Sequence, residues 1–383
     1  MHTPFALAWR QLARERGRLV VALLGTGFAV VLMLMQLGFR DALFESSVRL
    51  HERLNGEVFL INRQSQFLVQ MKSFTRRRLE QALAVPGVAS ASGLYLGLSV
   101  WKNPRLGILK DITVFAFDPR TPAIDIPEAT PQLAKLKIPE TVLVDRASRP
   151  EYGPIGADFA AGRLDVELND RKTTVAGTYV LGTSFGIDGS VITTDLNFHR
   201  LFPNRPPSLI DVGVVRVAPG VDPALVRDRL AAALPKDVLV LTKPAYMARE
   251  IAYWNVVTPI GYVFNLGVLI GLVVGGIIVS QILFSDVTDH LTEYATLKAM
   301  GHGNGYLYAV VLAQAVILAV LGYAPGLALA ALVYSVAAKA TLLPMTLTAP
   351  LALVVLALTV VMCCGAGILA LQKLRRVDPA EIF

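Results

Sequence analysis

The chain has 383 residues, of which 54% are hydrophobic and 17% charged, and it carries a formal net charge of +7 at pH 7. Ordinary soluble proteins contain about 25% charged residues, so a disordered chain and an entirely soluble globule are both excluded as good fits. Two cysteines cannot form a disulfide framework.

The charged residues are concentrated in one part of the chain. Residues 40–258 hold 27 of the 36 Lys and Arg and 23 of the 29 Asp and Glu. Residues 259–372 hold only Asp286, Asp289, Glu293, Lys298 and Lys339. This division predicts a soluble domain joined to a membrane part. The positive net charge then reflects membrane topology, and we expect no nucleic-acid partner.

Four stretches contain no Asp, Glu, Lys or Arg, and each is long enough to cross a bilayer. They are residues 19–39, 251–285, 299–338 and 340–372. A helix needs about 20 apolar residues to cross a hydrocarbon core about 30 Å thick. The predicted transmembrane helices are residues 19–38, 260–283, 306–334 and 349–371.

The first of these spans has an alternative interpretation as a cleaved signal peptide, because four arginines between residues 10 and 18 precede it. A signal peptide has an apolar region of about 7–15 residues followed by a small-residue cleavage site. This apolar run is longer and continues into residues 36–39 without such a site. We therefore expect an uncleaved anchor.

Lys and Arg near the ends of the spans predict the orientation of the chain. The N-terminal tail, residues 1–18, has four arginines, and the C-terminal tail, residues 372–383, has Lys373, Arg375 and Arg376. Both tails are predicted to be cytoplasmic. The segments between the spans then comprise an outer region at residues 40–258, a cytoplasmic loop at 284–304 and a short outer loop at 335–348.

The outer region is predicted to be a mixed α/β domain, residues 57–242, flanked by two helical segments. Those segments, residues 39–56 and 243–259, are expected to form a stalk, with amphipathic helices on the membrane surface as the alternative. Inside the domain, Asp222 and Pro223 are typical of a helix start. The predicted strands are 57–61, 94–101, 112–117, 142–144, 175–181, 191–194, 214–217 and 238–241, and the predicted helices are 74–83 and 223–234.

One sequence in this domain resembles a catalytic motif. Residues 182–186 match G-x-S-x-G, and Asp188 and His199 follow in the order found in α/β-hydrolases. A nucleophile elbow requires a strand that runs into a helix, whereas a turn and a second strand follow here. The segment is therefore interpreted as a hairpin between strands 175–181 and 191–194, not as a catalytic site.

Other chemistry-bearing patterns are absent from the sequence. It has no G-x-x-x-x-G-K-[ST] run for a triphosphate, and its five histidines lack metal-ligand spacing. Cys363 and Cys364 fall inside the last span, where packing explains them. We expect no catalytic, cofactor or metal site on this chain.

The residue types in the four predicted spans indicate close helix packing and not ion transport. Ionisable residues in membrane helices mark proton or ion pathways, and these spans have none in their interiors. Energy for any work must then come from another subunit. Small residues at four-residue intervals allow close approach of helices. Those predicted to do so are Gly267, Gly271 and Gly275 in the second span and Gly322 and Gly326 in the third.

The loop 286–301 is predicted to contain a short amphipathic helix on the cytoplasmic side. Asp286 or Asp289 could cap its start, and Gly301 stands where a glycine would end it. Val287, Leu291, Tyr294 and Lys298 recur on one side at three- and four-residue steps. Two interpretations remain open, an interfacial linker or a docking element for a cytosolic motor.

Two segments carry a resemblance to a known family. The sequence Glu293-Tyr-Ala-Thr-Leu-Lys-Ala-Met-Gly301 is similar to the E-x-x-x-L-K-A-x-G segment of FtsX/MacB-like permeases of ABC transporters, and residues 376–383 resemble their R-x-D-P-A-E ending. Further segments resemble the DevC branch of this family. They are residues 35–44, 95–97, 101–104, 145–150 and 181–186. The resemblance covers nearly the whole chain.

The resemblance implies a non-catalytic permease with four transmembrane helices and a MacB-like mixed α/β extracytoplasmic domain, in a bacterial inner membrane. Two copies would recruit a separate DevA-like ATPase that binds ATP and Mg²⁺, a DevB-like membrane-fusion adaptor and a TolC-like outer-membrane channel. MacB carries its ATPase on the same chain, whereas only 18 residues precede the first span here. The residues implied to meet the ATPase are Asp289, Glu293, Thr296, Leu297, Lys298 and Gly301.

Two alternatives to an exporter remain. Within the family, the chain could be an FtsX-like regulator or a lipoprotein-extracting permease. Outside it, the chain could be a membrane-anchored sensor or binding protein without a motor. Only the family members require a cytosolic ATPase.

Overall fold

The computed structural model describes residues 4–162 and 164–374, which form two compact units. Among the described residues, one unit is helical and contains 4–42, 259–341 and 345–374, and the other contains 43–162, 164–258 and 342–344. The resemblance in the tail, residues 376–383, lies outside the described residues. Each unit is described by itself.

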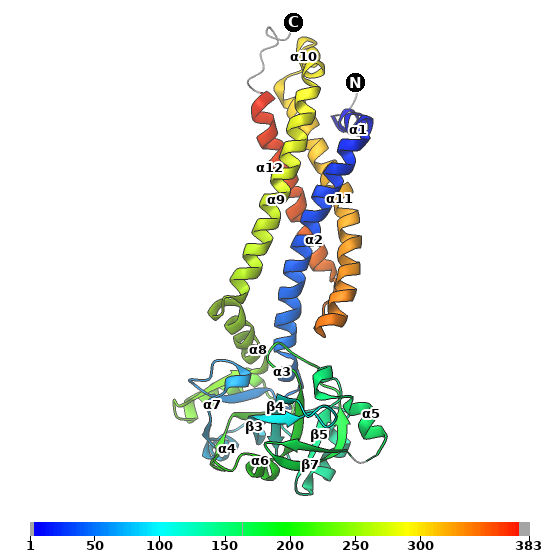
Figure 1. Cartoon of the computed structure of the whole chain (residues 1–383). Coiled ribbons are helices and arrows are strands. Elements are labelled where there is room, and N and C mark those ends of the chain that lie inside the picture. The colour runs from blue at the N-terminus through cyan, green and yellow to red at the C-terminus, as the bar shows by residue number, and fades with distance from the viewer. Residues whose placement is uncertain (1–3, 163, 375–383) are drawn as a thin grey trace. The chain divides into compact units, whose positions relative to one another are not determined.

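The helical unit contains four long apolar helices, which confirm the four predicted spans. In Figure 1 they run side by side, with α1 and α10 at one end of the unit. Its elements are α1 (Pro4–Arg14), α2 (Arg16–Ser47), α9 (Ile260–Asp289), α10 (Leu291–Ala299), α11 (Asn304–Thr341) and α12 (Ala349–Leu374). Within the N-terminal tail, Pro4–Arg14 is helical, and α9 continues six residues past the predicted span, to Asp289.

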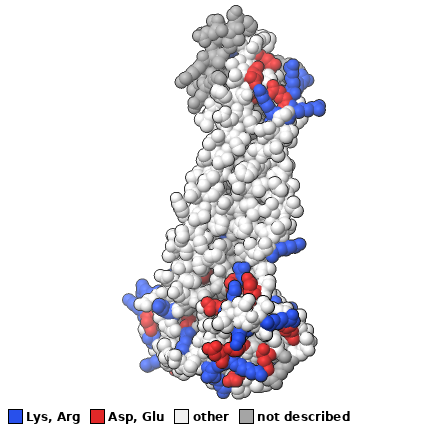
Figure 2. Space-filling view, in the orientation of Figure 1, with Lys and Arg blue, Asp and Glu red and all other residues white. Residues whose placement is uncertain are grey.

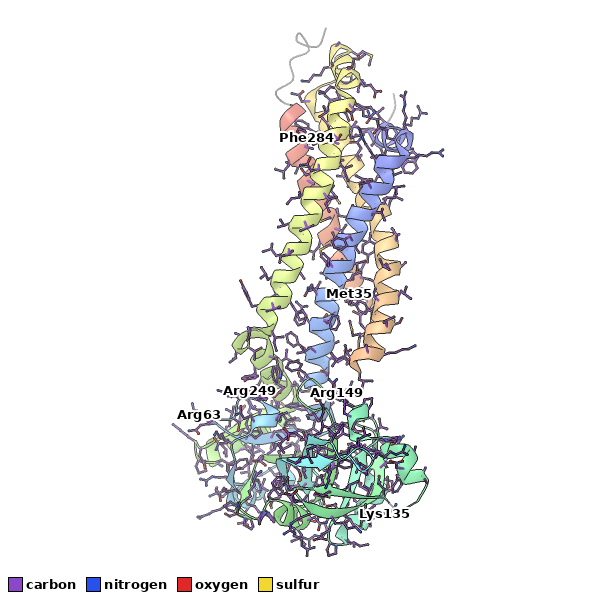
Figure 3. The ribbon with its side chains drawn as sticks, in the orientation of Figure 1. Met35, Arg63, Lys135, Arg149, Arg249 and Phe284 are labelled. Atoms are coloured by element: carbon purple, nitrogen blue, oxygen red, sulfur yellow. The ribbon has the colours of Figure 1, made fainter. Side chains whose placement is uncertain are left out.

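Charged side chains of the helical unit gather at the end that carries α1 and α10, and the face beyond them shows few Lys, Arg, Asp or Glu side chains (Figure 2). Many apolar side chains on these helices are exposed; Phe284 on α9, for example, is 40% exposed (Figure 3). Because lipid tails are as apolar as these side chains, such exposure is the expected state of a membrane helix.

The α/β unit is built on a nine-stranded mixed sheet with the order β11-β1-β10-β3-β4-β8-β5-β7-β6. An additional pairing of β3 with β6 closes the second part of this sheet on itself. The strands are β1 (Val58–Asn62), β3 (Val88–Lys102), β4 (Leu109–Phe117), β5 (Thr141–Asp145), β6 (Leu164–Leu168), β7 (Arg171–Tyr179), β8 (Ser190–Thr194), β10 (Val212–Val217) and β11 (Val238–Thr242). A separate small sheet pairs β2 (Phe74–Thr75) with β9 (Leu209–Ile210).

Helices and alternating strand residues give this unit two apolar cores. Successive residues of β1 point to opposite faces, so Val58 and Leu60 lie in one core and Phe59 and Ile61 in the other. The helices are α3 (Arg49–Arg53), α4 (Arg77–Leu83), α5 (Ile155–Ala160), α6 (Asp195–Leu201), α7 (Pro223–Ala233) and α8 (Lys243–Ala252), followed by a π-helical turn, Tyr253–Val257. Asp222 caps α7 by accepting a hydrogen bond from the Ala224 N–H, as predicted.

The hairpin predicted between strands 175–181 and 191–194 is wrong. β5 lies between β7 and β8, and it pairs with β7 in parallel and with β8 antiparallel. The turn residues that follow β7 do not return the chain to an adjacent strand. They form a separate loop, Leu181–Ile187, whose contacts are described below.

Candidate functional site

The short helix α10 presents one face to solvent. Thr292, Glu293, Thr296 and Ala299 are exposed and recur at helical spacing, and Met300 beside them is 65% exposed. On the opposite side Tyr294 and Ala295 are buried, and Leu297 and Lys298 are half-buried. Methionine is enriched at surfaces that another protein covers, so the exposed Met300 makes this end of the helix a candidate contact surface.

Gly301 ends α10 with a well-defined backbone motif. Its φ of +92° lies in the region that favours glycine. The His302 N–H donates to the Leu297 carbonyl oxygen at 3.1 Å, and the Gly301 N–H donates to that of Lys298 at 2.9 Å. These two bonds are those of a Schellman motif, which satisfies the last carbonyl groups of the helix. The predicted role of Gly301 as the terminating glycine is confirmed.

The predicted caps of this helix are wrong. Asp286 and Asp289 lie in the last turn of α9, and the residue before α10 is His290, which makes no side-chain cap. The carboxylate of Asp289 forms an ion pair with Arg18 of α2. Asp286 is 4% exposed and accepts a hydrogen bond from the Gln314 amide nitrogen of α11 at 2.7 Å. The two acids therefore join helices and do not start one.

A buried polar cluster holds α10 against α1, α9 and α11. We call its members, Gln11, Asp286, His290, Tyr294 and Gln314, the Gln11 cluster. The Gln11 side-chain oxygen accepts from Gln314 Nε2 at 3.1 Å and from the Tyr294 hydroxyl at 3.4 Å. Its amide nitrogen donates to Glu293 Oε2 at 3.1 Å. The single glutamine of α1 thus links two other elements of the helical unit, α10 and α11.

Burial makes this cluster costly to disturb. Gln11, His290 and Gln314 are at most 7% exposed. Burial also raises the pKa of the Tyr294 phenol, so this hydroxyl remains a donor at neutral pH. Sequence reasoning missed Gln11 and Gln314, since the partners of Gln11 lie 282 to 303 positions away along the chain and Asp286 lies 28 positions from Gln314. The available signal was the uncharged amide of Gln314 inside an otherwise apolar span.

The five predicted glycines lie at close helix contacts. A Cβ atom on Gly267 or Gly275 of α9 would come within 2.4 Å of Gln36 or 2.5 Å of Ala29 of α2, and one on Gly271 would touch Met33 at 3.3 Å. On α11, a Cβ on Gly322 would come within 2.6 Å of Thr26, and on Gly326 within 2.9 Å of the Gly27 carbonyl oxygen. The first span is therefore packed between α9 and α11 through glycines.

The residues of the hydrolase-like motif do not form a catalytic triad. Asp188 pairs with Arg149 Nε at 2.6 Å, and the His199 ring contacts Tyr95 and Phe198. The Ser184 N–H donates to the Ile187 carbonyl oxygen at 2.8 Å, within a closed loop. The expectation that this segment is not catalytic agrees with these separate partners. Among the described residues, no group of three or more His, Cys, Asp or Glu could hold a metal ion.

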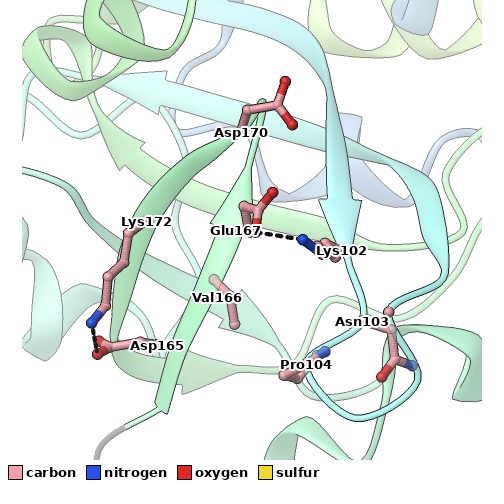
Figure 4. A pocket seen from close by; sticks show the side chains of 9 residues that line it. Lys102, Asn103, Pro104, Asp165, Val166, Glu167, Asp170 and Lys172 are labelled. Carbon is pink, nitrogen blue, oxygen red and sulfur yellow. Dashed lines mark hydrogen bonds and ion pairs between the residues drawn. The ribbon is translucent and has the colours of Figure 1, made fainter.

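The α/β unit has an open, charged cavity of about 440 Å³ beside β3 and β6 (Figure 4). Two ion pairs line it, Lys102 with Glu167 at 2.9 Å and Lys172 with Asp165 at 3.1 Å. These paired side chains are partly exposed and neutralise each other, and the carboxylate of Asp170 beside them is exposed, so the lining residues include no nucleophile poised for chemistry.

Comparisons with known proteins agree with the sequence resemblance. Residues 265–379 match the family model described as FtsX-like permease C-terminal. Over 98% of both chains, the protein is 23% identical to an ABC transporter permease of Mycobacterium tuberculosis strain H37Rv and 20% identical to another of Mycobacterium bovis. The resemblance to FtsX-like permeases is thus confirmed, and it includes α10 and the two helices that follow it.

Similarity to solved structures is weaker. The periplasmic region of MacB from Actinobacillus actinomycetemcomitans matches with a TM-score of 0.35 and 9% identity, covering 50% of this chain and 92% of that one. The extracellular domain of the noncanonic ABC-type transporter YknZ from Gram-positive bacteria matches with a TM-score of 0.34 and 11% identity, covering 48% and 98%.

Proposed function

We propose that this chain, an FtsX-like permease by its family match, is the membrane subunit of an ATP-driven export system of the DevC type. In this proposal it hydrolyses no ATP and instead transmits movement from a cytosolic ABC ATPase. The observation that carries the proposal is α10, a short helix between two spans with one exposed face, a buried polar seat and a glycine-defined end.

The geometry supports α10 as the docking element. Glu293 and Thr296 lie on its exposed face, where a groove of a DevA-like ATPase would cover them. Leu297 and Lys298 lie at the border of that face, and Gly301 fixes where the helix ends. Because Tyr294, on the buried side of α10, donates to Gln11 of α1, and Gln11 in turn accepts from Gln314 of α11, a displacement of the helix would pull on the spans.

The remaining parts of the system follow from the same proposal. Two copies of the chain would assemble in the bacterial inner membrane, with both tails cytoplasmic and the α/β unit outside. ATP and Mg²⁺ would bind to the ATPase subunits only. The α/β unit would meet a DevB-like adaptor connected to a TolC-like channel. The absence of ionisable residues inside the spans supports an external energy source, since a proton- or ion-driven carrier needs such residues.

The docking role is tested by replacing Glu293 and Lys298 together by alanine. The chain is co-expressed with its ABC ATPase, purified in detergent and reconstituted, and ATP turnover is measured. We expect at least a tenfold loss of permease-stimulated ATP turnover, because the exposed carboxylate and the adjacent amine are both removed. The matched control replaces another exposed Lys and Glu pair, Lys102 and Glu167 of the α/β unit, and should leave turnover unchanged.

Two outcomes would overturn the proposal. One is that no ATPase co-purifies with the wild-type chain, which would favour a sensor without a motor. The other is that the double variant retains both ATPase binding and stimulation. An adaptor in the same preparation would support the exporter over an FtsX-like regulator.

A further inference from the structure

The loop Leu181–Ile187 includes residues 181–186, which resemble the DevC branch and have no catalytic role. Hydrogen bonds hold this loop as a closed turn. The Gly182 N–H donates to Asp145 Oδ2 at 2.8 Å, and the Leu181 N–H donates to Oδ1 at 3.3 Å. Asp145 is only 1% exposed at the end of β5. The loop closes on itself through two backbone hydrogen bonds between Ser184 and Ile187, of 2.8 and 3.3 Å.

The first contact of this loop is with the segment that leads from the first span. Arg49 of α3 donates from Nη1 to the Thr183 carbonyl oxygen at 2.6 Å, and the Phe185 N–H donates to the Ser46 hydroxyl oxygen at 3.3 Å. A Cβ atom on Gly182 would come within 2.5 Å of Arg49 Nη1. Together with its φ of +84°, this explains why glycine stands there.

The second contact is with the segment that leads into the second span. The Phe185 ring lies 4.7 Å from the Trp254 ring in an edge-to-face arrangement. Trp254 belongs to the π-helical turn Tyr253–Val257 and donates from its indole nitrogen to Glu250 at 3.0 Å. The neighbouring Arg249, labelled in Figure 3, donates to the Ser65 carbonyl oxygen at 2.8 Å. Trp254 and the preceding helix α8 are therefore both held by contacts within the α/β unit.

The third contact is with the connection between the last two spans. Residues 342–344 of that connection belong to the α/β unit, although the helices on either side of it do not. The Thr183 hydroxyl donates to the Leu342 carbonyl oxygen at 3.2 Å. Leu342 has a φ of +59°, a conformation that costs a non-glycine residue about 1 kcal/mol or more and persists only where contacts hold it.

We infer that the loop Leu181–Ile187 is a clasp that fastens the three chain connections of the membrane helices to one point of the outer domain. Its positioning residues are Thr183, Phe185 and Arg49. The inference rests on the proposed function, and it adds the place where movement of the spans enters the α/β unit. A seven-residue loop that contacts residues 46–49, 254 and 342 ties segments that are far apart in sequence, so none of them can shift without breaking a specific contact.

The test uses the full chain with its ABC ATPase in lipid nanodiscs, with Mg²⁺-ATP and vanadate as the probe. Hydrogen exchange of the amides in residues 43–258 is measured with and without nucleotide. In the wild type we expect a nucleotide-dependent change in exchange in this unit. Thr183→Val removes the hydroxyl donor at nearly constant shape, and Phe185→Ala removes the ring contact. Each variant should reduce the change at least twofold while ATP turnover stays within twofold of wild type.

Three further variants separate positioning from simple stability. Thr183→Ser keeps the hydroxyl and should restore the nucleotide-dependent change, and Phe185→Leu should restore it in part. Thr121→Val, at an exposed position of the same unit, should change nothing. A wild-type chain that binds its ATPase but shows no nucleotide-dependent change in residues 43–258 would overturn the clasp alone. Full wild-type changes in both Thr183→Val and Phe185→Ala would also overturn it. Failure of the wild type to bind an ATPase would overturn the proposed function as well.

Discussion

The helical unit and the α/β unit are packed through different kinds of residues. In the helical unit, α2 approaches α9 and α11 through glycines, and the Gln11 cluster at one end supplies the buried polar contacts. In the α/β unit, large side chains such as Trp101, Tyr179 and Phe115 fill two cores, and buried polar groups lie among them. In the α/β unit, we therefore expect the largest losses of stability from substitutions that remove one partner of a buried polar contact. In the helical unit, we expect them from substitutions that enlarge a glycine at a helix contact.

The largest effect is expected at Asp211 in the α/β unit. This carboxylate is 2% exposed, accepts a hydrogen bond from the Leu96 N–H at 2.7 Å and pairs with Arg205. Asp211→Ala would leave a partly buried guanidinium without its partner and should lower the free energy of unfolding by about 3–5 kcal/mol. Chemical denaturation of the detergent-solubilised chain measures this loss.

The control for Asp211 is Lys102→Ala, which removes one partner of an exposed pair and should cost about 0–1 kcal/mol. Equal losses in the two variants would contradict the distinction between buried and exposed pairs.

The next effect depends on pH. Burial raises the pKa of Glu250 from 4.5 to about 7. The folded protein then holds this proton between pH 4.5 and 7 while the unfolded chain releases it, so the stability it contributes is present below pH 4.5 and is lost as the pH rises through 7. Glu250→Gln cannot ionise. As the pH rises from 4.5 to 7, the free energy of unfolding of the variant should therefore increase relative to that of wild type by up to about 3 kcal/mol.

Urea unfolding of the wild-type chain and the Glu250→Gln variant at pH 5, 6, 7 and 8 tests this slope. The offset between the two proteins at low pH reports the lost hydrogen bond, since the Leu68 N–H and the Trp254 indole both donate to Glu250. A difference between the two proteins that is independent of pH would show that Glu250 titrates normally.

The smallest effect tests added bulk in the helical unit. Gly326→Ala would place a methyl group 2.9 Å from the Gly27 carbonyl oxygen and from Val30 Cβ, so the two helices must separate. We expect the free energy of unfolding to fall by about 1–3 kcal/mol, which is measured as a lower unfolding temperature in detergent. Gly365→Ala is the matched control, because nothing lies within 4 Å of its added Cβ. If both variants unfold at the same temperature, the close approach of α2 and α11 is not what stabilises the bundle.

Local patterns predicted most of the elements. The four spans follow from stretches without charge, the Asp222 cap and the terminating Gly301 follow from residue types with strong backbone preferences, and the strands follow from short apolar runs. Strand order could not be predicted, because β5 inserts between β7 and β8 through pairings that no local pattern encodes. The caps at Asp286 and Asp289 were mistaken for the same reason: tertiary partners, Gln314 and Arg18, bind those carboxylates.

The same distinction between local patterns and tertiary contacts applies to the candidate site. The exposed face of α10 was visible as a periodic pattern, whereas its seat was not, because Gln11 and Gln314 reach it from distant parts of the sequence. Likewise, the hydrolase-like residues 182–186 could be rejected as a catalytic motif on sequence grounds. Their contacts with residues near 46, 254 and 342 appear only once the chain is folded.

The position of Gln11 in α1 has a practical consequence for anyone who handles this protein. Shortening the chain at its beginning, or fusing a rigid carrier directly to α1, would remove or displace the amide that binds Glu293, Tyr294 and Gln314. Such a preparation would still contain the four membrane helices, but α10 would have lost the contacts that hold it against α1 and α11. Purification tags therefore belong at the other terminus, or behind a flexible spacer.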